Sequence, residues 1–438
     1  MGELIGSTKS VCPVCLKTIK AYKIKKDKYI YLHKKCKEHG KFQTIIWRGS
    51  PDYKNWKRPK TPAHPKHPFT EISKGCPHDC GLCSDHRQHT CTALIEITQK
   101  CNLSCKFCFA DAGKNSEPDI ETIKYYYQRI MKASGNCNIQ LSGGEPTLRE
   151  DLDEIIKLGH DMGFSFIQLN TNGLKLKDLD YVKKLKHAGL NSVFLQFDGM
   201  NDTIYSNLRG KELLKDKLVA IENLRKMNIG IILVCTVVPR VNDYNIYEIV
   251  KFGIENIPAV RGVHFQPVSY FGRIPDIPKD NDRITLPEIM DKICKQSKGI
   301  IKTKDFSPPG CENAFCSFHA NYIEVDGNLI SVSSNKCGCK EEKGEDGSMK
   351  AKAFVKRNWS IEKSKSEDGK YKSFDNLAKK IRNNFFSISA MAFQDVWNLD
   401  IQRLMDCCIH VVSNEGNLIP FCAYNLTSKD GKNLYRED

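Results

Sequence analysis

The sequence predicts an α/β protein built around a partial, open (β/α)6 barrel. Between residue 92 and about residue 270, six short apolar segments typical of strands alternate with segments of helical periodicity. This alternation favours a parallel sheet with right-handed crossovers. Six units are fewer than a closed eight-stranded barrel needs, so we expect an open barrel with functional side chains at the C-terminal ends of its strands.

Apolar periodicity gives the expected strands and the clearest helices. The strands cover residues 93–98, 138–142, 165–170, 192–198, 230–238 and 262–268. The helices cover residues 120–133, 151–162 and 213–227. Thr147 with Glu150 three residues later has the pattern of a capping box, which predicts the start of the second helix.

Smaller units flank the expected barrel. The 438 residues, 40% hydrophobic and 27% charged, suffice for a large central domain with one or two smaller ones. We divide the chain into a metal-binding module at 1–60, a cysteine-rich segment at 61–91, the barrel at 92–280 and an extension at 281–438. No signal peptide and no apolar run of about 18 residues is visible, which predicts a cytoplasmic protein.

The formal net charge of +15 is compatible with nucleic acid, a membrane surface or an anionic substrate as partner. A lysine-rich solvated surface explains most of this excess. The sequence contains no recognisable nucleic-acid module, so we expect no nucleic-acid partner.

The first 60 residues carry two short metal-binding knuckles. Cys12-Pro-Val-Cys15 precedes a strand-like stretch, and Cys36-Lys-Glu-His39 follows it. Four such ligands suit one tetrahedral mononuclear site for Zn or Fe, in a zinc-ribbon or rubredoxin-like module. Two unrelated turns that contain cysteine are the alternative, but a unit of this size has little core, which favours a metal staple.

Beyond residue 280 the alternation of strands and helices ends. We expect a helix at 287–296, hairpins at 320–332 and 409–426, and a helix around 385–405 whose apolar face packs on the barrel. Residues 335–373 are rich in Lys, Glu, Ser and Gly, which predicts a mobile surface insertion.

The 20 cysteines cluster at two- and three-residue spacings, which favours iron–sulfur or zinc sites over disulfides. Cys101, Cys105 and Cys108 form a CxxxCxxC motif directly after the first barrel strand. Three thiolates on a [4Fe–4S] cluster leave one iron without a protein ligand. An open coordination site of this kind is what a catalytic metal centre needs.

A second motif, Gly143-Gly144-Glu145-Pro146, ends the second strand. Adjacent glycines allow a close backbone approach to a ligand, and Glu145 adds an acceptor suited to an ammonium group. Together with the cysteine motif, this segment resembles the radical S-adenosylmethionine (SAM) superfamily over residues 92–270. The resemblance implies that the cluster on Cys101, Cys105 and Cys108 binds and cleaves SAM, and that the glycine motif contacts its methionine part.

Polar residues also end the next two strands. Asn172 and Asp198 are candidates for contacts to the SAM ribose or to the substrate, and polar caps at the barrel rim are the alternative interpretation. The fifth strand lacks the GxIxGxxE pattern of many superfamily members, so contacts to adenine stay unassigned there.

Upstream of the barrel, Cys76, Cys80 and Cys83 repeat the CxxxCxxC spacing, and Cys91 follows. The array has no preceding strand and no following Gly-Gly-Glu. Since Cys91 would complete its coordination, we expect a closed auxiliary [4Fe–4S] cluster. A zinc site and a three-cysteine cluster with a free iron are the alternatives.

The C-terminal extension adds further cysteines. Cys408 and Cys422 flank the second hairpin, and Cys311 and Cys316 are candidates for the other ligands of another auxiliary cluster. This brings the expected [4Fe–4S] clusters to two or three. The remaining cysteines of the extension are Cys337 and Cys339, interpreted as a surface pair, and Cys407.

The order of the modules narrows the resemblance. The two knuckles, the segment 75–91 and the segment 406–425 together resemble the archaeal-type tetraether lipid synthases over nearly the whole chain. This resemblance implies C–C bond formation between the ends of isoprenoid chains of diether lipids, with peripheral contact to a membrane. It also implies an electron donor such as ferredoxin or flavodoxin.

Two other functions stay open. Members of the same group are also described as radical SAM methylases of a pterin precursor, which would need a small polar pocket with stacking aromatics rather than a long apolar groove. A non-catalytic iron–sulfur or zinc-ribbon protein is the third hypothesis. The cysteine and glycine motifs together disfavour it, because a carrier needs no open iron beside a methionine site.

Overall fold

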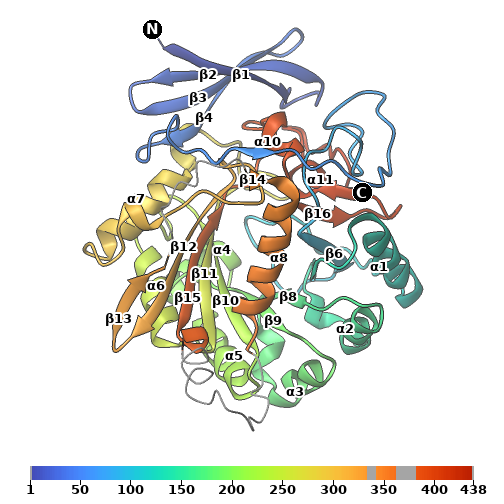
Figure 1. The fold of residues 1–438 in the computed structure, drawn as a ribbon, viewed down its shortest axis with the longest axis vertical. Coiled ribbons are helices and arrows are strands. Elements are labelled where there is room, and N and C mark those ends of the chain that lie inside the picture. The colour runs from blue at the N-terminus through green and yellow to red at the C-terminus, as the bar shows by residue number, and fades with distance from the viewer. Residues whose placement is uncertain (1, 333–341, 362–380, 437–438) are drawn as a thin grey trace.

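One mixed sheet of eleven strands organises the part of the chain that the structure describes (Figure 1). The structure is a computed structural model and describes residues 2–332, 342–361 and 381–436. Along the sheet the strands follow the order β13-β12-β15-β11-β10-β9-β8-β7-β6-β16-β17. A four-stranded and a two-stranded sheet accompany it.

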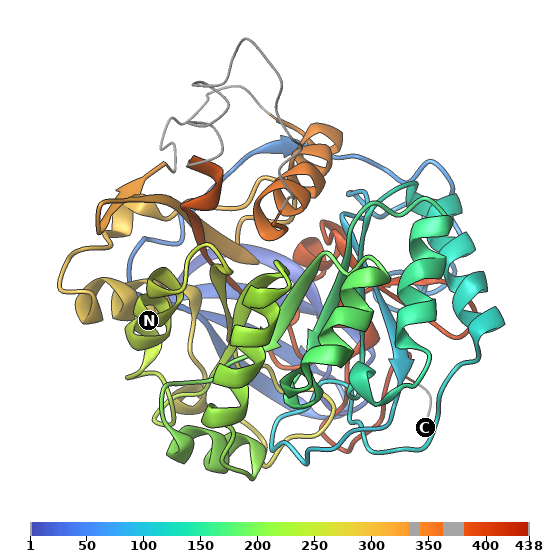
Figure 2. The same ribbon diagram turned by 90° about the horizontal axis from the view of Figure 1, so that it is seen from below.

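The six predicted strands form the parallel centre of the large sheet. They are β6 (Thr92–Thr98), β7 (Asn138–Gly143), β8 (Ile167–Thr171), β9 (Ser192–Gln196), β10 (Gly230–Val237) and β11 (Val260–Pro267). The helices between them lie along the outer side of the sheet (Figure 2). They are α1 (Ile120–Ser134), α2 (Leu152–Asp161), α3 (Leu179–His187), α4 (Asp202–Arg209), α5 (Leu214–Lys226) and α6 (Ile246–Glu255). The prediction of an α/β fold with a partial, open (β/α)6 barrel is therefore confirmed.

Apolar burial explains why these segments are strands. Ile95, Leu141, Leu169, Val193 and Ile231 lie opposite one another on five neighbouring strands, and all are fully buried. Side chains alternate between the two faces of a strand, so the residues next to this row point to the opposite face. That alternation leaves the inner face of the barrel free for polar side chains.

The C-terminal extension lengthens the barrel sheet at both edges. β15 (Phe385–Met391) lies parallel to β11, and β16 (Ile409–Val412) lies parallel to β6. β12 (Ser317–Val325) pairs with β15 and with β13 (Asn328–Ser331), and β17 (Leu418–Pro420) pairs with β16. Both expected hairpins are present, although the second ends in the short helix α11 (Phe421–Tyr424).

The predicted helix at 385–405 is wrong. Residues 385–391 form strand β15, and only α10 (Ile401–Met405) is helical. The segment alternates between buried apolar Phe386 and Ile388 and the serines Ser387 and Ser389. This period of two fits a strand with one face in the core and one face toward the barrel interior.

The predicted mobile insertion at 335–373 is wrong for its middle part. Residues Gly344–Trp359 form helix α8, which packs against β7, β10 and β11 and stands across the open side of the barrel (Figures 1 and 2). Ring contacts fix it, because Phe354 meets Phe385 and Trp359 meets Phe194 at centroid distances of 5.7 and 5.2 Å. Of the predicted range, 335–341 and 362–373 lie outside the described residues.

The predicted capping box of Thr147 and Glu150 is also wrong. A short 3-10 turn covers Pro146–Leu148, and α2 starts only after Asp151. The Thr147 hydroxyl donates instead to the Glu145 carboxylate at 2.6 Å. A buried carboxylate needs such donors, and this need overrides the local helix signal.

The N-terminal strands form an antiparallel sheet above the extension (Figure 1). They are β1 (Glu3–Val11), β2 (Thr18–Lys26), β3 (Tyr29–Cys36) and β4 (Gly40–Arg48). The inner face of this sheet contacts the segment before α10, where Asp400 pairs with Lys23 at 2.6 Å and accepts from the Thr8 hydroxyl at 2.6 Å. At its edge, Arg48 pairs with Glu288 of α7 (Leu286–Gln296) at 3.0 Å.

The two-stranded sheet joins β5 (Lys60–Thr61) in parallel to β14 (Glu342–Lys343).

Among the residues that the structure describes, no helix is long and apolar enough to cross a lipid bilayer.

Candidate active site

Cys101, Cys105 and Cys108 lie together on the loop after β6, and all three are half-buried. Backbone contacts fix this loop. Arg273 exchanges two backbone hydrogen bonds with Cys108, at 3.1 and 3.0 Å, and its side chain donates to the Cys105 carbonyl oxygen at 3.1 Å. The structure therefore brings these three predicted ligands to the C-terminal end of the first barrel strand.

Gly143 and Gly144 bring the end of β7 against the cysteine loop. The Gly144 N–H donates to the Thr98 carbonyl oxygen, and the Glu145 N–H donates to the Lys100 carbonyl oxygen, both at 2.7 Å. A Cβ atom at Gly144 would collide with the Lys100 carbonyl oxygen, and one at Gly143 with that of Thr98. Gly143 also has a φ of +117°, a conformation that favours glycine. Contact between two backbones thus requires this glycine pair.

The Glu145 carboxylate ties the ends of β7 and β8 together. It is only 1% exposed and accepts from the Thr147 N–H at 3.1 Å and from the Thr147 hydroxyl at 2.6 Å. It also accepts from the Thr171 hydroxyl at 2.6 Å and from the Asn172 N–H at 2.7 Å. These four donors use nearly all of the acceptor capacity of a carboxylate. The side chain therefore holds the rim of the barrel in place.

Asn172 supports the cysteine loop from the end of β8. Its side-chain amide donates to Asn102 Oδ1 at 2.7 Å, and Asn102 directly follows Cys101. Its own Oδ1 accepts from the Leu174 N–H at 3.0 Å. Asn172, which was predicted to contact the cofactor or the substrate, thus holds the cysteine loop in position.

Asp198 is fully buried and binds Arg209 in a bidentate ion pair, with two N–O distances of 2.8 Å. Burial disfavours the charge on Arg209, but the Asp198 carboxylate more than offsets this and raises the pKa of Arg209. The guanidinium also lies beside the Cys105 thiol. Nearby, burial lowers the pKa of Lys217 to about 8. Arg209 therefore places a buried positive charge beside one of the three cysteines of the loop.

The N-terminal knuckles meet as predicted from their spacing. Cys12, Cys15, Cys36 and His39 place one ligand atom each within 4.8 Å of all the others. His39 Nδ1 lies 3.6 Å from Cys12 Sγ and 3.5 Å from Cys36 Sγ. Zn–S bonds of about 2.3 Å in a tetrahedron separate the ligand atoms by about 3.8 Å. The four residues therefore fit one tetrahedral metal ion.

Cys91 joins Cys311 and Cys408 rather than the upstream array. The three buried thiols lie within 4.8 Å of one another, and Cys91 Sγ is 2.6 Å from Cys311 Sγ. Cys91 stands just before β6, where its N–H donates to the Cys408 carbonyl oxygen at 2.8 Å. The expected closure of the upstream array by Cys91 is therefore wrong, because the pairing of β16 with β6 draws Cys91 to Cys408.

Burial raises the pKa of the Cys91 and Cys311 thiols well above the ordinary value. A metal cluster stabilises the thiolates that burial disfavours, so this donor set fits one.

Cys76, Cys80 and Cys83 form a group of their own. The thiol of Cys76 raises the pKa of Cys80 well above its ordinary value, burial raises it further, and Cys83 acts in the same direction. Tyr435 fixes the turn, because it accepts from the Cys80 N–H at 2.8 Å and donates to the Pro77 carbonyl oxygen at 2.7 Å.

A further group contains Cys316, Cys407 and Cys422, with Arg403 beside it. The expected common site of Cys311, Cys316, Cys408 and Cys422 is therefore wrong. Cys407 and Cys408 are neighbours that lead into β16, and neighbouring side chains of an extended chain point to opposite sides. They thus serve two different groups. Cys337 and Cys339 lie outside the described residues.

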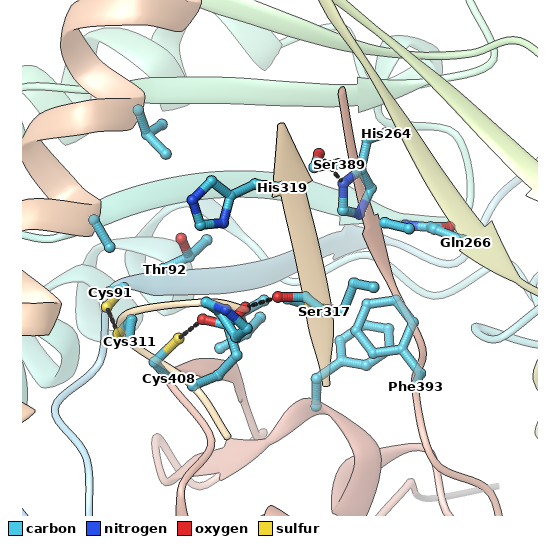
Figure 3. Close-up of a pocket in the computed structure, with 18 of the residues that line it drawn as sticks. Cys91, Thr92, His264, Gln266, Cys311, Ser317, His319, Ser389, Phe393 and Cys408 are labelled. Carbon is cyan, nitrogen blue, oxygen red and sulfur yellow. Dashed lines mark hydrogen bonds between the residues drawn. The ribbon is translucent and has the colours of Figure 1, made fainter. Parts of the chain in front are cut away.

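One cavity of about 430 Å³ connects two of these groups (Figure 3). Cys108 lines it at the loop after β6, and Cys91, Cys311 and Cys408 line another part of its wall. Each group offers three thiols, a donor set that would suit an iron–sulfur or other metal site. In Figure 3, His264 and Gln266 face these thiols from the opposite wall.

Rings and polar side chains line the cavity between the two groups. Phe194 stacks on His264 at a centroid distance of 5.6 Å and meets Trp359 of α8. His264 Nδ1 lies 2.9 Å from Ser389 Oγ, and burial lowers the pKa of His264 to about 4, so the ring is neutral. Further polar residues on the inner strand faces line the cavity as well: Asn138, Gln140, Asn170, Thr236, Gln266, Ser317 and His319.

This polar lining was not among the features predicted from the sequence. The signal in the sequence was a polar residue between two apolar ones, such as Gln140 between Ile139 and Leu141 in β7 and His264 between Val263 and Phe265 in β11. Strands buried on both faces are apolar throughout, so such residues indicate an inner face that meets a ligand.

Comparisons with known proteins agree with this architecture. The radical SAM superfamily model matches residues 95–253, and the HMPTM N-terminal zinc ribbon domain model matches residues 4–48. The 7,8-dihydro-6-hydroxymethylpterin dimethyltransferase of Methanocaldococcus jannaschii is 35% identical, over 95% of this chain and 93% of its own length. The GTP 3',8-cyclase of Nautilia profundicola is 28% identical, over 47% of this chain and 63% of its own length.

Among solved structures, native anSMEcpe with bound AdoMet and Cp18Cys peptide aligns with 48% of this chain and 58% of its own, at 23% identity and a TM-score of 0.38.

The barrel, the cysteine loop and the glycine pair define a radical SAM enzyme that also carries an N-terminal zinc ribbon and a C-terminal cysteine cluster. The chain belongs to the radical SAM superfamily and, within it, to the family of the dimethyltransferase from Methanocaldococcus jannaschii. That relative is named for a pterin and not for a lipid, so the expected resemblance to tetraether lipid synthases is not supported.

Proposed function

We propose that this enzyme methylates a dihydropterin of the 6-hydroxymethyl type. The observation that carries the proposal is the 35% identity to 7,8-dihydro-6-hydroxymethylpterin dimethyltransferase along nearly the whole of both chains. Similarity of that extent covers the knuckles, the barrel and the extension together. It favours the pterin hypothesis over the coupling of isoprenoid lipids.

The cavity supports a flat polar substrate. Its volume of about 430 Å³ lies within the range of pockets that enclose small molecules. The stack of His264, Phe194 and Trp359 offers ring faces to a planar bicyclic ligand. Carboxamides such as Gln140 and Asn170 carry both donors and acceptors, which suits the amide-like edge of a pterin.

The roles of the chain's own residues follow from their positions. When bound, the reduced cluster and SAM supply a 5′-deoxyadenosyl radical that abstracts hydrogen from a methyl donor. Cys101, Cys105 and Cys108 hold that cluster, and the glycine pair and Asn172 keep their loop in place. We further propose that residues 143–146, Asn172 and Asp198 border the SAM site. Gly144, Glu145 and Asn172 contact the cysteine loop directly, and Asp198 binds Arg209, which lies beside Cys105.

The neutral His264 binds rather than protonates the substrate in this proposal, since its pKa of about 4 leaves it uncharged near neutral pH. The group of Cys91, Cys311 and Cys408 holds an auxiliary cluster that borders the substrate. The upstream group and the Cys316 group are candidates for additional clusters, and the knuckles hold zinc.

Anaerobic incubation of the reconstituted enzyme with SAM, dithionite and 6-hydroxymethyl-7,8-dihydropterin tests the proposal by mass spectrometry. We expect a pterin product heavier by one or two methyl groups, together with 5′-deoxyadenosine. Cys101→Ala is the matched control and should form neither. A parallel incubation with archaeal diether lipids should leave them unchanged, and coupled lipid without methylated pterin would refute the proposal.

A further inference from the structure

The positive charge of the chain is concentrated in its N-terminal part. Residues 1–60 contain sixteen Lys and Arg but only four Asp and Glu, a formal charge of +12 out of +15 for the whole chain. An evenly solvated surface would spread the excess over 438 residues. Residues 1–60, which include the zinc ribbon, are therefore strongly basic, whereas the rest of the chain carries a formal charge of only +3.

Four lysines of the ribbon form a row across its sheet. Lys9 of β1 lies opposite Lys20 of β2, and Lys35 of β3 lies opposite Lys41 of β4. Lys20 and Lys35 are neighbours as well, because the adjacent pair in the register is Ala21 with Lys34. Three gaps between strands make the row about 14 Å long.

This row lies on the outer face of the ribbon. All four lysines are exposed, whereas Ser10, Ala21 and Lys34, next to them in the chain, are buried on the inner face. Among the described residues, none of the four lysines has an ion-pair partner. Like charges directly opposite one another destabilise a sheet, so local stability does not explain the row. An external anionic partner does.

The ribbon packs directly on the Cys76 group. The Thr18 hydroxyl donates to the Cys76 carbonyl oxygen at 3.4 Å, and Thr18 lies two residues from Lys20. Val11 and Leu16 share a buried apolar cluster with Cys80. The ribbon therefore lies between a protein seated on the lysine row and the Cys76 group.

We propose that the outer face of the zinc ribbon, centred on Lys9, Lys20, Lys35 and Lys41, is the docking surface for an acidic one-electron carrier protein. Lysine is a strongly hydrated point charge, which suits a short-lived and electrostatically steered encounter. Nucleic-acid surfaces favour arginine, and the single arginine of these four strands, Arg48, is paired with Glu288. The proposal rests on the SAM cleavage of this enzyme class and not on the pterin substrate.

The carrier meets a requirement of the reaction. Each cleavage of SAM consumes one electron: the sulfonium accepts it, the S–C5′ bond breaks, and methionine and a 5′-deoxyadenosyl radical form. The reduced carrier donates this electron and dissociates in its one-electron-oxidised form. No other co-reactant is needed.

Binding is measured first, because it does not depend on catalysis. Oxidised flavodoxin, an acidic carrier, is titrated onto the immobilised enzyme at low and high salt. We expect the charge-reversed variant to have a Kd for flavodoxin at least about tenfold higher than that of the wild type, and this Kd should no longer depend on salt. That variant carries Lys9→Glu, Lys20→Glu, Lys35→Glu and Lys41→Glu. A matched control reverses four exposed lysines on the barrel helices: Lys132→Glu, Lys157→Glu, Lys215→Glu and Lys226→Glu.

Kinetics then separate docking from damage. With reduced flavodoxin as donor, the ribbon variant should show a KM for flavodoxin raised about tenfold or more, while dithionite-driven SAM cleavage and the zinc content stay at wild-type levels. A Kd and KM equal to those of the control variant would overturn the proposal. The proposal would also be overturned if the ribbon variant no longer bound anionic vesicles but kept wild-type kinetics with flavodoxin. That result would mean that the lysine row binds a lipid surface. If the ribbon variant loses zinc, the same lysines are changed to Gln instead. The Kd and KM of that variant should then rise by a smaller factor, and wild-type values would overturn the proposal equally.

Discussion

Replacing Gly144 by alanine tests the contact between the glycine pair and the cysteine loop. The φ of Gly144 lies outside the left-handed region, so alanine carries no backbone strain there. The whole effect comes from its Cβ, which would collide with the Lys100 carbonyl oxygen. That carbonyl sits one residue before Cys101 and accepts from the Glu145 N–H at 2.7 Å.

The magnitude follows from these contacts. Overpacking typically costs about 1–3 kcal/mol, and the two backbone hydrogen bonds at 2.7 Å contribute about 0.5–1.5 kcal/mol each. A local loss of about 2–6 kcal/mol disfavours the ligand-ready loop at least about 30-fold. Gly6→Ala is the matched control, because its added Cβ would meet only Lys23 Cδ, at an ordinary contact distance of 3.9 Å.

Electron paramagnetic resonance of the dithionite-reduced protein gives the readout, with 5′-deoxyadenosine formation measured in parallel. We expect Gly144→Ala to lose the signal that changes on addition of SAM, and to lose SAM cleavage with it. Cleavage at the wild-type rate would show that the collision with Lys100 does not control the loop. A full cluster signal that no longer responds to SAM would instead mean that Gly144 serves SAM directly.

Three further predictions concern the rest of the site. Cys101→Ala should abolish SAM cleavage, whereas Cys408→Ala should keep some cleavage and lose the methylated product, as read by chromatography of both products. Arg209→Met leaves Asp198 buried without its counter-charge and should lower the free energy of unfolding by about 3–5 kcal/mol in urea, and the double variant with Asp198→Asn should recover part of that loss. The pKa of His264 falls from 6.5 in the unfolded chain to about 4 in the folded one, so the unfolded chain binds the proton first as the pH drops. Stability should therefore decline between about pH 6.5 and 4, and His264→Gln should remove about 2 kcal/mol of this decline by pH 5; equal declines in both proteins would contradict it.

Short-range chain geometry made much of the site predictable. The spacing of Cys101, Cys105 and Cys108 puts three thiols on one loop, and the alternation of strands and helices puts that loop at the active end of a parallel sheet. The two N-terminal knuckles were predictable for the same reason. Each knuckle is a tight local turn, and a single hairpin-length segment brings the two together.

Predictions failed where the structure of a segment depends on contacts with strands that are distant in the sequence. Phe386, Ser387, Ile388 and Ser389 already alternate with the period of a strand. A strand forms there only because the edge of the sheet beside β11 is open to pair with it. Helix α8 likewise looked like a polar insertion. Its place in the fold depends on two ring contacts, of Trp359 with Phe194 in β9 and of Phe354 with Phe385 in β15.

The sequence by itself determined the enzyme class, because the cysteine loop and glycine pair are local motifs whose spacing is fixed by a few peptide units. Only the tertiary structure decided which distant cysteines share a group and what lines the cavity between them. Cys91 meets Cys408 across more than 300 residues because β16 pairs with β6, and Cys407 turns away because adjacent side chains point to opposite sides of the chain. Such contacts depend on strand pairing at the sheet edges, which no spacing along the chain encodes.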